Sequence, residues 1–155
     1  MTNPVKLVPI VMSVLFAFVA TLLTTSPAMA QNEEPALPEV RFVTTEGPFV
    51  LQLRPDVAPK TVENFLAYVN SGFYDGTIFH RVIPGFMVQA GGFDENLGRK
   101  QTRAPIVNEA TSTLPNLRGT IAMARTNAPD SATSQFFINV ANNDFLNAGV
   151  RGPGY

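Results

Sequence analysis

The sequence predicts a mainly β domain, a barrel or a sandwich, with one clear helix and an export signal in front of it. Many short segments alternate apolar and polar residues, as half-buried strands do. Only one segment has the spacing of an amphipathic helix. The 155 residues suffice for one domain and include no cysteine, so a hydrophobic core must hold the fold without disulfides.

The N-terminus has the features of a secretory signal. Lys6 supplies a positive start, residues 7–23 are almost wholly apolar, and Ala28-Met29-Ala30 has the small-x-small form that signal peptidase cuts. We therefore expect a signal peptide over residues 1–30, a flexible lead-in over 31–38, and the folded domain over 39–155. The expected location is the periplasm, with the membrane met only during export. An uncleaved anchor is the alternative, because the apolar run is long.

Charge and residue types exclude several function classes. Cleavage removes only Lys6 of eleven Lys and Arg, which leaves ten basic against twelve acidic side chains. A near-neutral balance without a basic block argues against nucleic acid as a main partner. His80 is the single histidine, so a metal site of the usual His/Cys type is not expected, and no other cofactor is implied. We find no paired carboxylates that would suggest hydrolysis of carbohydrate.

The domain begins with a predicted hairpin and a helix. Residues 40–42 and 49–53 alternate apolar and polar side chains, and Glu46-Gly47-Pro48 predicts the turn between them. Apolar residues then recur from Val62 to Val69 at the i, i+3, i+4, i+7 spacing of a helix that ends near Gly72. A short helix with one apolar face should lie against a sheet or the mouth of a barrel.

The rest of the chain alternates strands with loops. Residues 76–92 have the pattern of two strands around a Pro84-Gly85 turn. Residues 93–117 are polar and irregular, and loops of this length are usually functional or disordered. Further strands are predicted within 118–125 and 135–140, and turn-forming residues follow to the end.

The predicted hairpin places a cation on an apolar face. If residues 84–86 form the turn, Ile83 lies opposite Met87 and Arg81 lies opposite Gln89, and these four side chains share one face. Gln89 could hold the guanidinium in place or bind a ligand amide.

Taken alone, this face does not require a function. A lone arginine in a strand is most often a solvated edge residue. A single histidine such as His80, flanked by Phe79 and Arg81, is most often structural.

The stretch FHRVIPGFMVQAGGF, residues 79–93, resembles the central motif of the cyclophilin-type peptidyl-prolyl cis-trans isomerases. The resemblance continues in residues 58–83, in GTIAMAR, in DSATSQFFINV and in DFLN, all in family order. It covers nearly all of residues 40–146, and its details look most like the bacterial periplasmic branch. It implies catalysed rotation about X-Pro peptide bonds in unfolded exported proteins, by an enzyme that needs no cofactor. We expect a monomer, because the sequence carries no oligomer signal.

The resemblance also assigns site residues. Arg81 matches the catalytic arginine, whereas His80 remains structural. Gln89 matches the glutamine that binds the substrate backbone and steadies the arginine. The other substrate-binding positions implied by the family are Phe86, Met87, Ala124, Arg125, Gln135, Phe137, Phe145, Leu146 and Tyr155. Of these, Phe86, Met87, Phe137 and Leu146 match the proline pocket. Alternation predicts that Phe137 faces the groove and Phe136 the interior.

The sequence departs from the family pattern at several positions. Arg125 stands where many members have asparagine, which should alter contacts to the residue before proline. Phe145 stands where drug-sensitive eukaryotic members have tryptophan, which implies weak binding of cyclosporin. Tyr155 matches a groove position that many eukaryotic members fill with histidine.

Family members continue past the position of Tyr155 with further strands and often a second helix. The resemblance therefore implies a closed antiparallel β-barrel with a capping helix that is incomplete here, either a fragment or an early stop. A non-catalytic proline-peptide-binding module, or an inactive truncated isomerase, is the alternative function.

Overall fold

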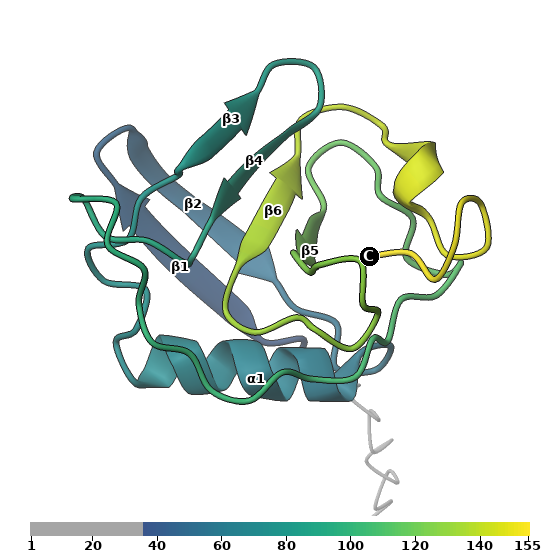
Figure 1. The fold of residues 1–155 in the computed structure, drawn as a ribbon, viewed down its shortest axis with the longest axis horizontal. Helices are drawn as coiled ribbons and strands as arrows, with labels where there is room; N and C mark the ends of the chain where they lie inside the picture. Colours follow the sequence, from purple (N-terminus) through teal and green to yellow (C-terminus); the bar gives the residue numbers. More distant parts are fainter. Residues whose placement is uncertain (1–35) are drawn as a thin grey trace, which may run out of the picture. The chain divides into compact units, whose positions relative to one another are not determined.

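The computed structural model describes residues 36–155, and all that follows concerns this part of the chain. It contains six strands, one α-helix and one 3₁₀ turn (Figure 1). The predicted signal peptide over 1–30 and most of the predicted lead-in lie outside the described residues.

The first two strands form an antiparallel hairpin. Strand β1, Glu39–Thr44, pairs with β2, Gly47–Gln52, from Glu39 opposite Gln52 to Thr44 opposite Gly47. The turn therefore lies one residue earlier than the predicted Glu46-Gly47-Pro48. Gly47 pairs with Thr44 and so already belongs to β2, and its φ of 110° is one that a residue without Cβ adopts at little cost.

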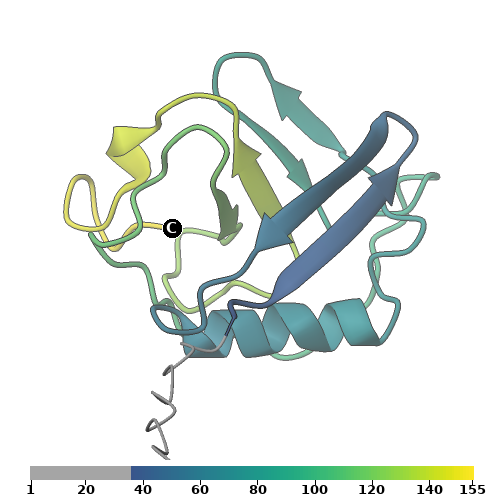
Figure 2. The same cartoon turned by 180° about the vertical axis from the view of Figure 1, so that it is seen from behind.

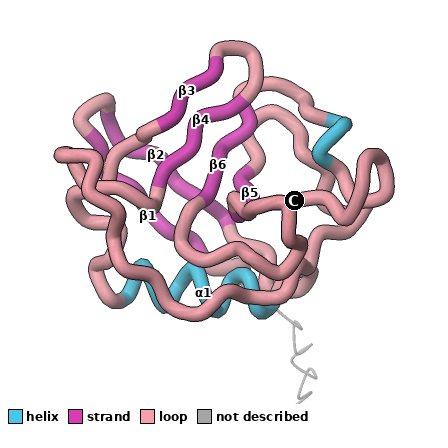
Figure 3. The backbone as a smooth tube through the Cα atoms, viewed as in Figure 1, coloured by secondary structure: helices cyan, strands magenta, loops and turns pink. Residues whose placement is uncertain are grey.

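A second sheet carries four antiparallel strands, and β1 and β2 run behind it in the tube drawing (Figure 3). Its order is β3, Arg81–Ile83; β4, Met87–Ala90; β6, Phe136–Asn139; and β5, Ile121–Met123. Arg81 pairs with Gln89 and Ile83 with Met87, which confirms the predicted hairpin register. All four strands are short, and the loops between them provide much of the molecule's surface.

One face of this sheet packs into an aromatic core. Phe136 is 1% exposed and meets the rings of Phe42, Phe65 and Tyr74 at centroid distances between 5.5 and 5.7 Å, mostly edge to face. Such arrangements add to the stabilisation from burial. The core thus joins β6 to β1 and to the helix.

Helix α1, Pro59–Asn70, runs beneath the ends of the strands in both views (Figures 1 and 2). Its buried residues include Val62, Phe65 and Tyr68, so the predicted apolar face is the one that packs. Gly72 follows the helix with a φ of 66° and donates to the Val69 carbonyl, as expected of a helix stop.

The irregular segment 93–117, which we call the strap, runs antiparallel to α1 and crosses in front of it in Figure 1. At one end of the helix Lys100 Nζ donates to the Phe73 carbonyl. Midway, the Arg103 amide donates to Tyr68 Oη at 2.8 Å. At the other end the Glu109 carboxylate accepts from the amides at the helix start. The predicted long loop is therefore an ordered element.

The expected closed barrel is not present in residues 36–155. The strands form a two-stranded and a four-stranded sheet, with no hydrogen-bonded pairing between the two. Residues of β2 and of β5 line one hollow, and β1 and the segment 74–79 line a second. The observed architecture is thus mainly β with one helix. No helix in this part of the chain has the length and apolarity to span a bilayer.

Candidate active site

The face of the four-stranded sheet opposite the core carries a row of side chains from all four strands. The registers place Arg81 beside Gln89, Gln89 beside Phe137, and Phe137 beside Ala122. Because residues paired across antiparallel strands project to the same side, these four share the outer face. The sheet thus sets an exposed cation two strands, roughly 10 Å, from a buried aromatic ring.

A chain of hydrogen bonds steadies this row. Arg81 Nη1 donates to Gln89 Oε1 at 3.3 Å, and Gln89 Nε2 donates to Gln135 Oε1 at 2.8 Å. The second bond fixes the orientation of the Gln89 amide, so that its oxygen faces the guanidinium. The predicted pairing of Arg81 with Gln89 is therefore present, and Gln135 extends it.

Two glycines allow residues 134 and 135 to lie close to the chain after β4. A Cβ on Gly92 would lie 2.6 Å from the Gln135 side chain, and one on Gly91 would lie 2.8 Å from the Ser134 carbonyl. Ser134 is fully buried and its hydroxyl donates to the Gly91 carbonyl at 2.7 Å. The Gly-Gly pair thus allows the loop before β6 to lie directly against the end of β4.

A cluster of aromatic side chains borders the row. Phe137 is 5% exposed and meets the Tyr155 ring edge to face, with centroids 5.7 Å apart. Phe86, in the β3–β4 turn, stacks on Phe145 at 5.6 Å. Met87 lies next to the turn and is almost fully buried. Beside Arg81 the sheet therefore offers apolar surface of the kind that accepts a hydrocarbon ring.

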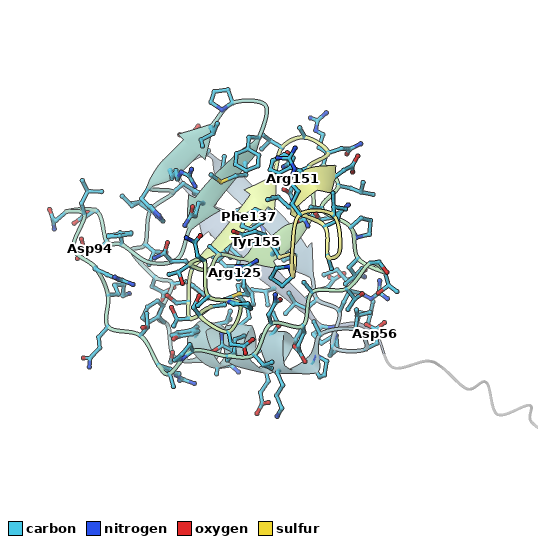
Figure 4. All side chains as sticks on the ribbon, turned by 45° about the vertical axis from the view of Figure 1, so that its right-hand side comes forward. Asp56, Asp94, Arg125, Phe137, Arg151 and Tyr155 are labelled. Atoms are coloured by element: carbon cyan, nitrogen blue, oxygen red, sulfur yellow. The ribbon has the colours of Figure 1, made fainter. Side chains whose placement is uncertain are left out.

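Arg125 follows β5 and lies against Tyr155. Its Nε and Nη2 atoms donate to the Gly154 carbonyl at 3.1 and 2.8 Å, and its guanidinium carbon lies 4.2 Å from the centre of the Tyr155 ring. Figure 4 shows Arg125, Tyr155 and Phe137 gathered together. The neighbouring Ala124 amide donates to the Gln135 carbonyl at 2.8 Å, which continues the β5–β6 ladder beyond β5.

An asparagine network, which the sequence reasoning did not single out, holds the turn that carries Phe86. Asn143 Nδ2 donates to the Phe86 carbonyl at 2.9 Å and to Asn139 Oδ1 at 2.7 Å. Asn139 in turn donates to Asn116 Oδ1 at 3.2 Å. All three asparagines are at most 3% exposed. The available signal was Asn139, a polar residue inside an otherwise apolar strand.

His80 lies next to Arg81 but is not part of this row. Its ring packs 4.6 Å from the Phe93 ring, and its Nδ1 atom is buried without a hydrogen-bond partner. Burial, with a smaller contribution from the Arg81 charge, lowers the pKa of His80 below its ordinary value. A neutral, packed imidazole fits the structural role predicted for it.

Comparison with known proteins assigns this arrangement to a family. Residues 39–151 match the model of the cyclophilin-type peptidyl-prolyl cis-trans isomerases. The chain belongs to this family. It is 56% identical over 137 residues to peptidyl-prolyl cis-trans isomerase A of Dickeya dadantii. The aligned region covers 88% of this chain and 70% of the Dickeya protein. The chain is 57% identical over 116 residues to an isomerase of Acinetobacter baylyi, which covers 75% of this chain and 62% of that protein.

Solved cyclophilins share the fold. An isomerase of Cryptosporidium parvum, crystallised in the presence of the dipeptide Ala-Pro, superposes with a TM-score of 0.61 at 32% identity, over 71% of this chain and 72% of that one. The predicted family and the cyclophilin fold are thereby confirmed, and these two bacterial isomerases agree with the bacterial branch.

The structure brings the predicted cyclophilin residues to one side of the sheet. Arg81, Gln89, Phe137 and Met87 project from the strands, and Gln135 reaches them by a hydrogen bond. Phe86 and Phe145 meet beside them, and Leu146 accepts a hydrogen bond from the Tyr155 amide at 3.2 Å. Arg125 bonds to the chain's own carbonyls, and its predicted effect on contacts to the residue before proline stays a prediction.

Proposed function

We propose that this cyclophilin accelerates rotation about X-Pro bonds in exported polypeptides, with Arg81 as the catalytic residue. The observation that carries the proposal is the cross-strand row, which sets a cation hydrogen-bonded to Gln89 on the same face as the apolar side chains of Met87 and Phe137. Relatives that share more than half of the aligned residues are named peptidyl-prolyl cis-trans isomerases.

The chemistry requires a donor rather than a nucleophile. Resonance in the peptide bond sets a barrier of about 18–20 kcal/mol. As the bond twists, the proline nitrogen loses resonance and gains a lone pair. A fixed N–H donor aimed at that nitrogen stabilises the twisted state more than either planar state. The guanidinium suits this role because it stays charged and presents five N–H donors, of which Gln89 takes one.

The apolar surface beside Arg81 supplies the other half of the mechanism. A proline ring seated against Phe137 and Met87 would exclude water from the space between these side chains and Arg81. Lower water content strengthens the field of the cation at the nitrogen. Phe86 and Leu146, at the edge of the same surface, are proposed to complete the pocket.

Replacement of Arg81 tests the assignment. We expect Arg81→Ala to lower kcat/KM for a proline tetrapeptide by about 10²–10³-fold, the range measured when a charge-stabilising donor is removed. Arg81→Lys keeps the charge without the planar fork and should recover only part of the loss. Exchange spectroscopy by NMR on the same peptide separates catalysis from binding.

Arg41→Ala is the matched control, because Arg41 is also an exposed arginine in a strand but lies in β1. It should leave the exchange rate unchanged. Peptide binding without acceleration in the wild type would instead favour the non-catalytic binding module. An Arg81→Ala protein as active as the wild type would refute the catalytic assignment.

We further propose that the two sheets are parts of one barrel, closed when a strand occupies each of the two hollows. The backbone edges of β2 and β5 flank one hollow, and β1 flanks the other. Unpaired edges are ready templates for strand addition.

We also propose export, with cleavage after Ala30 and function in the periplasm. The support is the charged start, the apolar run and the Ala28-Met29-Ala30 site. Mass spectrometry of the exported product's N-terminus distinguishes cleavage from a retained anchor.

A further inference from the structure

We propose that Arg125 is a positioning residue, which acts on the substrate through Tyr155. It holds the Tyr155 ring edge-on against Phe137 and so fixes one wall of the apolar pocket that receives the proline ring. The inference rests on the proposed isomerase function and adds a determinant of substrate affinity to it.

Arg125 contacts both the backbone carbonyl of Gly154 and the ring of Tyr155. Nε and Nη2 converge on the Gly154 carbonyl, and the flat face of the guanidinium lies over the Tyr155 ring, 4.2 Å from its centre. Because the carbonyl directly precedes Tyr155, one side chain fixes both where the residue sits and how its ring is turned.

The donors of Arg125 are committed to the chain itself. Nη1 donates to the Thr126 carbonyl at 2.9 Å, so all three kinds of guanidinium nitrogen have a carbonyl partner within this chain. The side chain is half-buried rather than extended into solvent. This geometry favours a residue that shapes the pocket over one that donates to the peptide backbone.

The backbone that precedes Tyr155 has little freedom to move if the contacts of Arg125 are lost. Gly154 is buried with a φ of 76°, and a Cβ at this position would lie 2.6 Å from the Ala148 amide nitrogen. Asn108 Nδ2 donates to the Gly154 carbonyl at 3.2 Å, but it does not contact the ring. Loss of Arg125 would therefore leave the backbone path in place and release the ring.

Lysine cannot replace arginine here. Its ammonium group is a compact point charge, whereas the planar guanidinium bonds in two directions within its plane and stacks on an aromatic face. Arg125→Lys therefore keeps the charge of the groove and removes the clamp, which makes it the informative substitution.

The test compares Arg125→Lys, Tyr155→Leu and the double variant in isomerisation of a proline tetrapeptide. We expect Arg125→Lys to raise KM by about 3–10-fold, the worth of a partly desolvated cation–π contact, with kcat within about twofold of the wild type. If Arg125 acts through the ring, the double variant is no worse than Tyr155→Leu alone.

Arg103→Lys is the matched control for stability. Arg103 also stacks on a tyrosine, with its guanidinium carbon 5.3 Å from the centre of the Tyr68 ring, and also donates to a carbonyl, that of Ala67, but it lies in the strap and its partners belong to α1. It should lower Tm by a similar amount and leave KM unchanged. If Arg103→Lys and Arg125→Lys change KM equally, the effect of Arg125 is general destabilisation and the proposal is wrong.

A readout without catalysis separates this proposal from the isomerase assignment. Nuclear Overhauser contacts between the Tyr155 and Phe137 rings should be present in the wild type, weakened in Arg125→Lys and retained in Arg103→Lys. If the wild type does not accelerate exchange, the isomerase assignment fails. The contacts between the Tyr155 and Phe137 rings still test whether Arg125 holds the Tyr155 ring in place. Retained ring contacts in Arg125→Lys, or multiplicative KM effects in the double variant, would overturn the proposal.

Discussion

The two faces of the four-stranded sheet use aromatic residues for different ends. On the core face, Phe136 meets four other rings and is 1% exposed. On the groove face, its neighbour Phe137 meets Tyr155 and shares a row with Gln89 and Arg81. Consecutive residues of one strand thus serve the core and the site.

Within the single strand β6, the side chains on one face contribute mainly to stability and those on the other face mainly to activity. The core face gains from burial and from ring contacts, which are insensitive to charge. The groove face sets polar groups at fixed positions beside apolar surface, where their electrostatic effect is strongest. Substitutions on the two faces should therefore change different measurements.

The adjacent phenylalanines give the largest expected contrast. Phe136→Ala should lower the free energy of unfolding by about 3–5 kcal/mol, because it leaves a cavity among buried rings. Phe137→Ala should cost less stability and raise KM for a proline tetrapeptide by about tenfold, which corresponds to about 1.4 kcal/mol. Urea unfolding and steady-state kinetics on both variants check the pair. Equal loss of stability with an unchanged KM would remove the distinction between the faces.

A smaller effect should follow from Gly92→Ala. The added Cβ would lie 2.6 Å from Gln135 and displace its side chain, which breaks the hydrogen bond to Gln89 and releases the Gln89 amide. Loss of one hydrogen bond is worth about 0.5–1.5 kcal/mol, so kcat/KM should fall by about 3–10-fold. The melting temperature should change little, because Gln135 is a flexible side chain on the groove side.

The double variant Gly92→Ala, Gln135→Ala gives the control for this substitution. Without the Gln135 side chain the new methyl group has nothing to displace, so the double variant should match Gln135→Ala alone. A double variant that is much less active than Gln135→Ala would show that Gly92 acts by another route.

The pH dependence is expected to be the smallest effect on activity. Arg81 remains charged, so the isomerisation rate of the folded protein should be flat from about pH 5.5 to 8.5. Stability should behave differently, because burial lowers the pKa of His80. The unfolded chain then binds the proton more readily than the folded one. Stability is thus constant above about pH 6.5, the ordinary histidine pKa, and falls as the pH drops below it.

Urea unfolding across this pH range measures the effect, and His80→Asn should reduce the slope. A break in the isomerisation rate near pH 6.5 would instead give His80 a part in catalysis.

Period-two alternation predicted much of this arrangement from the sequence. It correctly placed Arg81 opposite Gln89, and Phe136 and Phe137 on opposite faces, because a strand leaves no other choice once the turn is located. The helix was predictable for the same reason, since its apolar residues follow a single period. The resemblance then gave these positions their proposed roles.

Contacts between distant segments could not be predicted in this way. The donors of Arg125 meet a carbonyl 29 residues away, and no local pattern encodes that contact. The asparagine network is hidden for the same reason, because asparagine is also the common residue of loops. The sequence of the strap showed no periodicity and so did not predict that its side chains are hydrogen-bonded along the helix.

The capping of α1 by Glu109 has a consequence for the order of folding. The helix has no capping side chain at its own N-terminus, and the Glu109 carboxylate accepts from the Lys60 and Thr61 amides at 3.1 and 2.7 Å. Thr61 and Glu109 are 48 residues apart, so the β3–β4 hairpin and the strap as far as Glu109 must be synthesised before these hydrogen bonds can form. The cap of α1 is therefore a late contact during synthesis, although the apolar pattern of the helix is local.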